Sequence, residues 1–401
     1  MKPIIIVGAG LAGYTVAREF RKLDKTARLT IITADDGGFY SKPMLSNGFA
    51  HNKLARQLVT QTADQMATQL DAKIISRTQV GGIDSKNRIV DTDAGRFDYP
   101  RLVIAVGAQP IRLAIGGDAA DQVLSVNHVA DYEAFRFKIA LAKVRATARV
   151  AILGAGLIGC EFADDLAGAG HAVTLIDPNP LPLAALAAPA LSQGLQAALS
   201  SRGIALRLGT TAVRIDQAAN GLQVTLADGN EFETDIVLSA VGLRPDLSLA
   251  QAAQLTTGRG IVVDATGRTS APDIYALGDC AEYTAQDGST RTLPYIAPLM
   301  TAARAIARTL TGQVTAIDLK PAPVIVKTPS YPVALVAPPP HAVGKGYWHG
   351  ETENERMICR FYDEQGVMLG FGVAPQEAAV RQQLLAALGT VAATGPLQAL
   401  T

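Results

Sequence analysis

The sequence contains few cysteines and few aromatic residues, and neither charge is in excess. Three cysteines among 401 residues, Cys160, Cys280 and Cys359, lie far apart and form no C-x-x-C pattern. A disulfide framework, a zinc site and an iron–sulfur cluster are therefore not expected. Basic and acidic side chains number 36 each, so overall charge gives no reason to expect binding to nucleic acid or to a membrane surface.

Long uninterrupted apolar runs are also missing. The longest stretch without charge, residues 178–201, contains prolines and glutamines and predicts a loop followed by a buried Ala/Leu-rich helix, not a membrane span. The first predicted strand begins at residue 3, which leaves no room for a signal peptide. With the low cysteine count, this predicts a cytoplasmic protein. The chain length predicts two or three domains.

A strand–helix–strand pattern occurs twice. Residues 3–8 are a continuous apolar run, an amphipathic helix follows, and a second strand is expected at 27–33. Residues 148–177, which include "AILGAGLIGCE", repeat the arrangement. Continuous apolar strands separated by helices are typical of parallel strands buried on both faces. The first helix is expected to turn these side chains inward: Tyr14, Val16, Ala17, Phe20 and Leu23.

Further strands are expected at 101–107, 235–242 and 273–279. Residues 316–336 and 356–373 predict shorter alternating strands, joined by a loop that contains "VAPPPHAVGKG". The expected fold is α/β, with two Rossmann-like, doubly wound, three-layer domains and a small α+β C-terminal domain.

Each repeat carries a Gly-x-Gly-x-x-Gly loop between its strand and its helix. Backbone amides and the helix dipole make such a loop a site for a pyrophosphate, provided that no side chain blocks the approach. The first glycine permits the tight turn, the second the close approach of the backbone, and the third the packing of helix on strand. The two sets are Gly8, Gly10 and Gly13, and Gly154, Gly156 and Gly159.

A carboxylate at the end of the next strand can bind ribose hydroxyls. Asp35 or its neighbour Asp36 serves the first loop, and Asp177 serves the second. Asp177 would accept hydrogen bonds from a free 2′-hydroxyl and repel a 2′-phosphate, and the following residues "PNP" supply no cation. The chain is therefore expected to bind two dinucleotides, and the second loop is expected to prefer NADH over NADPH.

Three further segments resemble the FAD-dependent pyridine-nucleotide reductases that lack a redox disulfide. They are "GIVVDATGRTSAPDIYALGDCAEY" at 260–283, "LVIAVGAQP" at 102–110 and "LSAVGLRPD" at 238–246. The resemblance implies that the first loop binds FAD and the second NAD. It also implies that Asp279 binds the ribitol chain and that the helix after it points its N-terminus at the flavin pyrimidine.

The resemblance is closest to rubredoxin–NAD(+) reductases, and it covers essentially the whole chain. The segments that carry it are "ADDGGFYSKPMLSNG", "LGAGLIGCEFADDL", "LPYIAPLM" and "VKTPSYP". It implies a fold of glutathione-reductase type with an inserted NAD domain. The implied boundaries are 1–113 for the first part of the FAD domain, 114–246 for the NAD domain, 247–318 for the second FAD part and 319–401 for the C-terminal α+β domain.

The same resemblance implies roles for three charged residues. Glu161, expected in the first turn of the NAD helix, would reach the nicotinamide amide and the flavin edge, and Lys42 would lie beside flavin N5; both are candidate catalytic residues. Lys327 would face the flavin from the C-terminal domain. Many relatives have Thr at the position of Val106 and Lys at that of Asn47, so no role is carried over for these two.

The complete expected site follows from the motifs and the resemblance together, and it includes no metal ligand. For FAD it comprises Gly8, Gly10, Leu11, Ala12, Gly13, Asp35, Lys42, Pro43, Val80, Ala105, Gly107, Asp279, Pro298 and Lys327. For NAD it comprises Gly154, Gly156, Leu157, Ile158, Gly159, Glu161, Asp177, Val241 and Gly242.

The electrons must leave without a dithiol relay, because "GFYSKPMLSNGF" holds no cysteine and Cys160 and Cys280 occur singly. The expected acceptor is rubredoxin, an acidic carrier reduced one electron at a time, which would feed an iron-dependent oxygenase such as an alkane hydroxylase. A basic patch could steer it, and the candidate cations are Lys42, Lys53, Arg56, Lys327 and Lys345.

Three alternatives remain open at this point. Two are enzymes of the same architecture, an NADH:ferredoxin reductase and an NADH oxidase. The third is a flavoprotein whose redox state controls binding, as in the apoptosis-inducing-factor branch, although no long basic extension supports it. The oligomeric state is expected to be a monomer or a weak homodimer.

Overall fold

The computed structural model describes residues 2–142, 147–285 and 288–391. The chain forms two compact units, and each is made of three separate stretches of sequence. Unit 1 comprises Met1–Lys42, Arg56–Gln109 and Leu243–Lys320, and unit 2 comprises Pro43–Ala55, Pro110–Gly242 and Pro321–Thr401. Within the described residues, no helix combines the length and the apolar character that crossing a bilayer requires.

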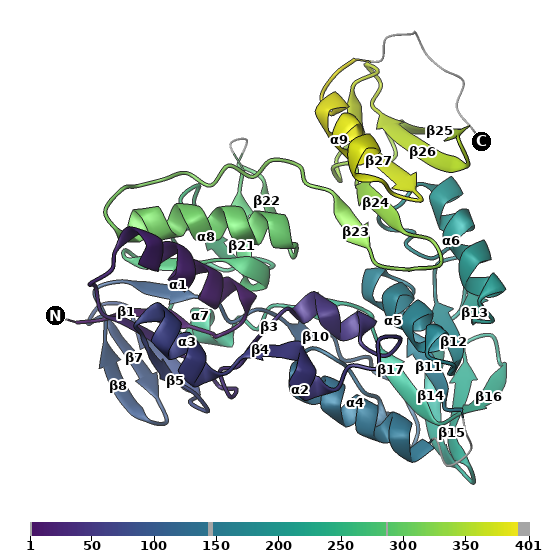
Figure 1. The fold of residues 1–401 in the computed structure, drawn as a ribbon, viewed down its shortest axis with the longest axis horizontal. Helices are drawn as coiled ribbons and strands as arrows, with labels where there is room; N and C mark the ends of the chain where they lie inside the picture. The colour runs from purple at the N-terminus through teal and green to yellow at the C-terminus, as the bar shows by residue number, and fades with distance from the viewer. Residues whose placement is uncertain (1, 143–146, 286–287, 392–401) are drawn as a thin grey trace. The chain divides into compact units, whose positions relative to one another are not determined.

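Unit 1 is built on a five-stranded parallel sheet in the order β20-β9-β1-β2-β5. The strands are β1 (Ile4–Val7), β2 (Leu29–Ile32), β5 (Lys73–Ile75), β9 (Leu102–Ile104) and β20 (Ile274–Ala276). Residues of the central strands β1, β2 and β9 are buried throughout, as their continuous apolar character predicts. Helices α1 (Leu11–Leu23) and α8 (Ile296–Leu310) pack against each other in this unit (Figure 1).

The parallel arrangement determines where the motifs of unit 1 gather. The segments that follow β1, β2, β9 and β20 all leave the same edge of the sheet, because parallel strands place their carboxyl ends together. These segments contain Gly8, Asp35, Gly107 and Asp279 respectively. Four motifs that lie up to 271 residues apart in sequence therefore meet at one edge.

One expectation for the first helix is wrong. Tyr14, Val16, Ala17 and Phe20 are buried as predicted, but Leu23 is 51% exposed. Leu23 is the last residue of α1, so the inward-facing stripe ends one turn earlier than the sequence pattern indicates.

The remaining elements of unit 1 extend this core. A three-stranded antiparallel sheet consists of β6 (Val80–Asp84), β7 (Ile89–Thr92) and β8 (Gly95–Asp98). Asp279 lies in a short 3-10 helix, Gly278–Cys280, and the next long helix, α8, begins only after strands β21 (Ala281–Thr284) and β22 (Thr290–Thr292). The other elements are β3 (Phe39–Tyr40), β4 (Val59–Gln61), α3 (Ala63–Leu70), α7 (Ser248–Ala252) and β19 (Ile261–Val263), with α2 (Ala55–Leu58), β10 (Gln109–Pro110) and β18 (Leu243–Arg244) at the unit boundaries.

Unit 2 contains the second predicted repeat as a four-stranded parallel sheet in the order β13-β12-β11-β17. The strands are β11 (Arg149–Leu153), β12 (Ala172–Asp177), β13 (Ala205–Leu208) and β17 (Ile236–Ser239), with helices α4 (Val129–Ala142), α5 (Leu157–Gly168) and α6 (Pro189–Ser201). An antiparallel sheet that the sequence patterns do not show consists of β14 (Ala212–Ala218), β15 (Gly221–Leu226) and β16 (Glu231–Thr234).

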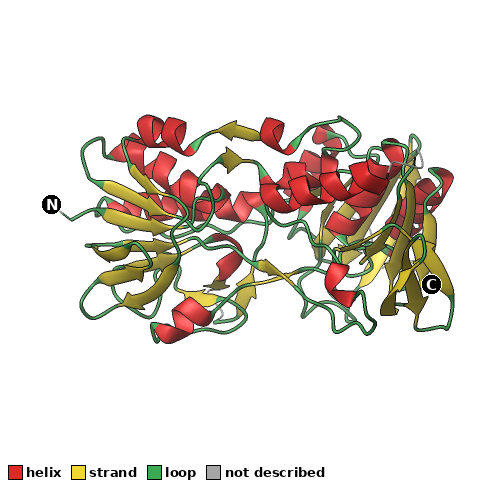
Figure 2. Ribbon diagram, turned by 90° about the horizontal axis from the view of Figure 1, so that it is seen from below, coloured by secondary structure: helices red, strands yellow, loops and turns green. Residues whose placement is uncertain are grey.

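The C-terminal part of unit 2 is a five-stranded antiparallel sheet, β23-β24-β27-β26-β25, followed by α9 (Ala378–Ala387). Its strands, yellow in Figure 2, are β23 (Val324–Val326), β24 (Val333–Val336), β25 (Tyr347–Glu353), β26 (Arg356–Tyr362) and β27 (Met368–Ala374). Strand β25 is absent from the sequence prediction. Among the described residues it pairs with β26 alone, at the edge of the sheet, and its sequence "YWHGETE" carries the polar and charged side chains with which proteins protect sheet edges.

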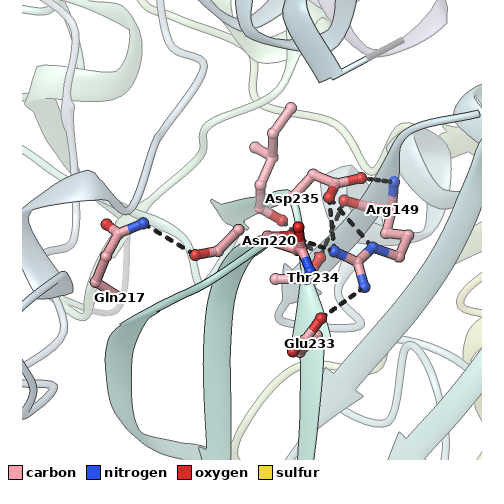
Figure 3. Close-up of polar contacts among 8 residues, drawn as sticks. Arg149, Gln217, Asn220, Glu233, Thr234 and Asp235 are labelled. Carbon is pink, nitrogen blue, oxygen red and sulfur yellow. Dashed lines mark hydrogen bonds and ion pairs between the residues drawn. The ribbon is translucent and has the colours of Figure 1, made fainter. Parts of the chain in front are cut away.

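Arg149 joins the four-stranded parallel sheet of unit 2 to the antiparallel sheet β14-β15-β16 (Figure 3). Its guanidinium group donates to Asp235 at 2.8 and 3.2 Å, to Glu233 at 3.3 Å and to the carbonyl of Asn220 at 2.7 Å. Its backbone N–H donates to the other Asp235 oxygen at 2.7 Å. One side chain at the start of β11 thus holds the ends of β15, β16 and β17 together.

We expect Arg149→Met to lower the free energy of unfolding by about 1–2 kcal/mol, because it leaves the half-buried Asp235 carboxylate without its guanidinium donors. A matched control is Arg214→Met, whose pair with Asp216 on β14 is more exposed, at 57% for the arginine side chain; its effect should stay below about 0.5 kcal/mol. Urea unfolding of both variants measures the difference, and equal effects would contradict this role for Arg149.

Candidate functional site

The first glycine loop of unit 1 is close-packed at two of its three glycines and open at the third. Gly8 has a φ of +108°, and a Cβ there would lie 2.3 Å from the carbonyl oxygen of Ala105. A Cβ on Gly13 would lie 1.9 Å from the carbonyl oxygen of Gly8. Gly10, the N-cap of α1, has nothing within 4 Å of such a Cβ. Two glycines are therefore required by packing, and the third borders open space.

The second loop, in unit 2, reproduces this geometry. Gly154 has a φ of +102° and its Cβ would lie 2.8 Å from the carbonyl oxygen of Ala240, while a Cβ on Gly159 would lie 1.8 Å from that of Gly154. Gly156, the N-cap of α5, again borders open space. Neither N-cap glycine makes a side-chain cap, so each helix N-terminus presents its amides to whatever occupies that space. Both loops fit a dinucleotide pyrophosphate.

The expected ribose carboxylates differ in their surroundings. Asp35 accepts hydrogen bonds from the Thr33 hydroxyl at 2.6 Å and from the Gly37 N–H at 3.0 Å, whereas Asp36 accepts from the Gly38 N–H. Both are exposed. Asp35 is thus attached to the end of β2, and Asp36 to the loop that follows, which favours Asp35 as the ribose ligand.

Asp177 is nearly buried and organises its own loop. One carboxylate oxygen accepts from the Ala155 N–H of the glycine loop at 2.6 Å, and the other accepts from the backbone and side-chain N–H groups of Asn179, both at 2.8 Å. Its 8% exposure leaves a small accessible face. Asp177 therefore places negative charge at the loop and also fixes the loop's conformation, a structural role that its spacing alone does not reveal.

The Gly278–Asp279 turn lies against the start of α1 within unit 1. Gly278 has a φ of +77°, and a Cβ there would lie 3.1 Å from the Cβ of Ala12. Its N–H donates to the hydroxyl of the buried Tyr283 at 3.1 Å. This packing brings the half-buried Asp279 to the same sheet edge as the first glycine loop.

Glu161 is fully buried and makes an ion pair with Lys327. One Glu161 oxygen accepts from the Lys327 ammonium at 2.7 Å and from the Ser46 hydroxyl at 2.5 Å, and the other accepts from the Lys327 backbone N–H at 2.9 Å. Helix α5 begins at Leu157, so Glu161 lies just beyond the first turn and not within it. A glutamate that served only to complement the helix dipole would need neither this burial nor these partners.

The Lys327 ammonium has three further acceptors on the 3-10 helix Lys42–Asn47. These are the carbonyl of Pro43 at 2.6 Å, the side-chain oxygen of Asn47 at 2.6 Å and the Ser46 hydroxyl at 3.3 Å. The Asn47 side-chain amide in turn donates to the Lys327 carbonyl at 3.0 Å. Sequence reasoning gave Asn47 and Ser46 no role, and no local signal could have paired them with a residue about 280 positions away.

The ion pair also affects the proposed basic patch. The Lys327 side chain is only 33% exposed, and its charge is compensated by Glu161. Lys345 and Arg56 are exposed, while Lys42 and Lys53 are half-buried. Unit 2 contains Lys53, Lys327 and Lys345, whereas Lys42 and Arg56 belong to unit 1. The grouping of these five residues into one patch stays a prediction.

All three cysteines are buried: Cys160 lies in α5, Cys280 in the 3-10 helix Gly278–Cys280 and Cys359 in β26. The Cys160 and Cys280 thiols donate to backbone carbonyls of their own turns. Burial raises the pKa of Cys280 to about 11 and the pKa of Cys160 still further. Both therefore stay protonated at neutral pH and are unreactive as nucleophiles.

The other expected site residues border these two loops or the sheet edge of unit 1. Leu11 and Ala12 open α1, Leu157 and Ile158 open α5, and Val80 starts β6. Ala105 directly follows β9, Pro298 lies in the first turn of α8, and Val241 and Gly242 follow β17. These placements fit their predicted roles, which remain predictions.

Family comparisons match nearly the whole chain. A model described as pyridine nucleotide-disulphide oxidoreductase matches residues 2–326, and a model described as rubredoxin binding C-terminal domain matches residues 316–388. A rubredoxin-NAD(+) reductase from Alcanivorax borkumensis is 42% identical over 96% of this chain and 98% of its own. A nitric oxide reductase FlRd-NAD(+) reductase from Aeromonas salmonicida is 39% identical over 96% of each chain.

Solved structures show the same fold. The ferredoxin reductase for the CYP199A2 system from Rhodopseudomonas palustris superposes with a TM-score of 0.85 at 25% identity, covering 98% of this chain and 96% of that one. Putidaredoxin reductase in its covalent complex with putidaredoxin gives 0.85 at 24% identity, with coverage of 97% and 94%. The predicted α/β fold is confirmed.

The two kinds of loop glycine should respond differently to a methyl group. We expect Gly156→Ala to leave the stability of the protein within about 0.5 kcal/mol of wild type, because its Cβ meets no protein atom. Its KM for NADH should rise by at least about tenfold, since the methyl occupies the approach of the pyrophosphate. Gly159→Ala should instead lower the melting temperature.

Thermal melts and NADH titrations of both variants provide the test. The corresponding variants of the first loop, Gly10→Ala and Gly13→Ala, show whether the effect on KM is specific to the second loop. They should change the flavin content of the protein, and the protein that retains flavin should keep the wild-type KM for NADH. A Gly156→Ala enzyme with wild-type KM would show that the open space is not the pyrophosphate site.

Proposed function

Because the chain belongs to the pyridine nucleotide-disulphide oxidoreductase family, we propose that it is a rubredoxin–NAD(+) reductase. It uses FAD and NADH and delivers electrons to rubredoxin. The observation that carries this proposal is the combination, in one chain, of two open glycine loops with a C-terminal segment matching a rubredoxin-binding domain.

Unit 1 would hold FAD through its glycine loop, Asp35 and Asp279, and unit 2 would hold NADH through the second loop and Asp177. FAD, when bound, supplies the chemistry of accepting a hydride from NADH and releasing electrons singly. The protein then contributes position and electrostatics, and no acid–base side chain is needed for the transfer.

Glu161 and Lys327 would act as one unit in this proposal. The fully buried carboxylate would hold the ammonium in place, and the ammonium, 33% exposed, would be the member of the pair that presents its charge to a bound cofactor. Since both groups are held by several hydrogen bonds, neither has to reorganise when the cofactors bind. Lys42 is the first residue of the 3-10 helix Lys42–Asn47, which contacts the ion pair through Ser46 and Asn47. It would supply a second cation toward the flavin.

The cysteines support direct transfer to an outside carrier. Relatives that reduce disulfides need a reactive thiol pair, whereas each cysteine of this chain is buried and single. Electrons must therefore go from the flavin to a partner protein or a small oxidant. The match of residues 316–388 to a rubredoxin-binding domain favours the partner protein.

The acceptor is tested by NADH oxidation with a panel of oxidants. We expect the holoenzyme to reduce rubredoxin with kcat/KM at least about a hundredfold above that for a [2Fe–2S] ferredoxin, since specific docking discriminates by several kcal/mol. Oxygen alone should give slow turnover. Efficient turnover only with ferredoxin, or rapid oxygen consumption without a carrier, would instead support one of the two alternative enzymes.

The coenzyme preference depends on the charge of Asp177. We expect kcat/KM for NADH to exceed that for NADPH by at least about tenfold, because a 2′-phosphate would meet this carboxylate and the residues that follow it, "PNP", supply no cation. Asp177→Asn keeps the shape of the side chain and removes its charge, so it should lower the ratio of kcat/KM for NADH to kcat/KM for NADPH. Any loosening of the glycine loop in this variant would lower both kcat/KM values by the same factor. Equal kcat/KM values in the wild type would exclude this role.

A further inference from the structure

Helix α5 carries three buried acidic side chains. Glu161 and Asp164 are fully buried and Asp165 is 3% exposed. Glu161 and Asp165 lie four residues apart and therefore share one face of the helix. A buried carboxylate is costly unless donors surround it, so the partners of these acids indicate what the helix is built to hold.

Each acid binds a segment that lies outside the parallel sheet of its domain. Asp165 accepts from the backbone N–H groups of Phe49 at 2.7 Å and Ala50 at 3.0 Å. Asp164 accepts from the Ser330 N–H at 2.9 Å and pairs with Arg202 at 2.8 Å. With the Glu161–Lys327 pair, α5 thus anchors two distant stretches, residues 43–50, which we call the anchored segment, and residues 327–330.

The anchored segment has little freedom around the Asp165 contact. The Phe49 ring packs edge-on against Tyr132 and Phe135, with centroids 5.3 and 5.2 Å away, and the Arg136 guanidinium lies 4.9 Å from its centroid. A Cβ on Gly48 would lie only 2.2 Å from the Tyr132 hydroxyl oxygen. The backbone at residues 48–50 is therefore fixed on both sides.

The fixed backbone adjoins the residues that hold the ion pair. Ser46 and Asn47, which contact Glu161 and Lys327, directly precede Gly48. Consecutive Cα atoms are about 3.8 Å apart, so a shift at Phe49 is passed to Asn47 within two residues. Among the described residues, no hydrogen bond or ion pair joins Asp165 to Glu161 or Lys327.

Ionisation of Asp165 matters for this contact. Burial raises its pKa, and the amides of Phe49 and Ala50 oppose that shift by stabilising the charged form. Two nearby groups act in opposite directions: His51 lowers the pKa of Asp165, and Asp164 raises it. The pKa of Tyr132 is raised by burial and also by the negative charge of Asp165. An ionised carboxylate can accept both amides, whereas a side-chain amide of the same shape would turn an N–H toward one of them.

We infer that Asp165 is a positioning residue for electron transfer, which acts through the anchored segment to hold the Glu161–Lys327 pair in its working geometry. The inference rests on the proposed function for the role of that pair. It predicts that the loss of the Asp165 charge lowers the rate of the chemical steps and leaves NADH binding unchanged, because Asp165 lies outside the glycine loop.

The test compares the Asp165→Asn holoenzyme with Asp235→Asn. Asp235 is a matched control, because its carboxylate also accepts a backbone N–H and lies in unit 2 away from the anchored segment. We expect Asp165→Asn to lower kcat about tenfold with KM for NADH within about twofold, the scale of effect that misplacement of reacting groups produces. Asp235→Asn should leave both values close to wild type.

Hydrogen–deuterium exchange gives a readout that is independent of turnover. Asp165→Asn should raise the exchange rate of peptides covering residues 43–50 by at least about tenfold, because one of the two amides loses its acceptor and faces an N–H group instead. Peptides from β14 and β15 should be unchanged. In Asp235→Asn the anchored segment should keep its wild-type protection.

Several results would overturn the inference. They are an Asp165→Asn enzyme with wild-type kcat, an equal fall of kcat in both variants, and unchanged exchange at residues 43–50. If Asp165→Asn does not fold, Gly48→Ala displaces the same segment without altering charge and must show the same selective fall in kcat. If NADH fails to reduce the flavin of the wild-type protein, the proposed function is refuted. The hydrogen–deuterium exchange result would still test whether Asp165 holds the anchored segment.

Discussion

A carboxylate that is shut off from water has to be surrounded by donors, and in unit 2 this requirement determines which segments fold together. Glu161 has zero exposure, and Lys327, 166 residues away, supplies both an ammonium and a backbone N–H to its carboxylate. That ammonium in turn needs the carbonyl and side-chain oxygens of Pro43 and Asn47. Breaking such an arrangement at one member leaves an uncompensated buried charge, so three stretches of chain are mutually dependent.

The parts of the molecule that could be predicted from the sequence are those governed by neighbours in the chain. A glycine with φ near +105° and another whose Cβ would strike the preceding turn recur at fixed spacing in both loops. The steric requirement is local, so the pattern shows it twice. The continuous apolar strands of the two parallel sheets are equally local, and both βαβ units form as expected.

Other features could not be predicted from the sequence, because they depend on residues far away in the chain, on a position at the edge of a sheet or on a position at the end of a helix. No pattern within "FADDL" indicates that Asp165 binds the amides of Phe49 and Ala50, because a backbone N–H has no sequence identity. Strand β25 lies at an edge and is polar, which hides its alternation. Leu23 fits the helical stripe of α1, yet it lies where the helix ends and the packing surface stops.

Lys327 connects the C-terminal sheet of unit 2 with helix α5. It lies within residues 316–388, the segment that matches a rubredoxin-binding domain, and its ammonium binds the helix that opens at the second glycine loop. One charge therefore joins the segment that matches a rubredoxin-binding domain to the helix that follows the second glycine loop, and both lie in unit 2. Removing one member of this pair would leave the other as a buried unpaired charge, so the position of the segment that follows β23 depends on the position of α5. This dependence rests on one ion pair and its hydrogen bonds and involves no thiol.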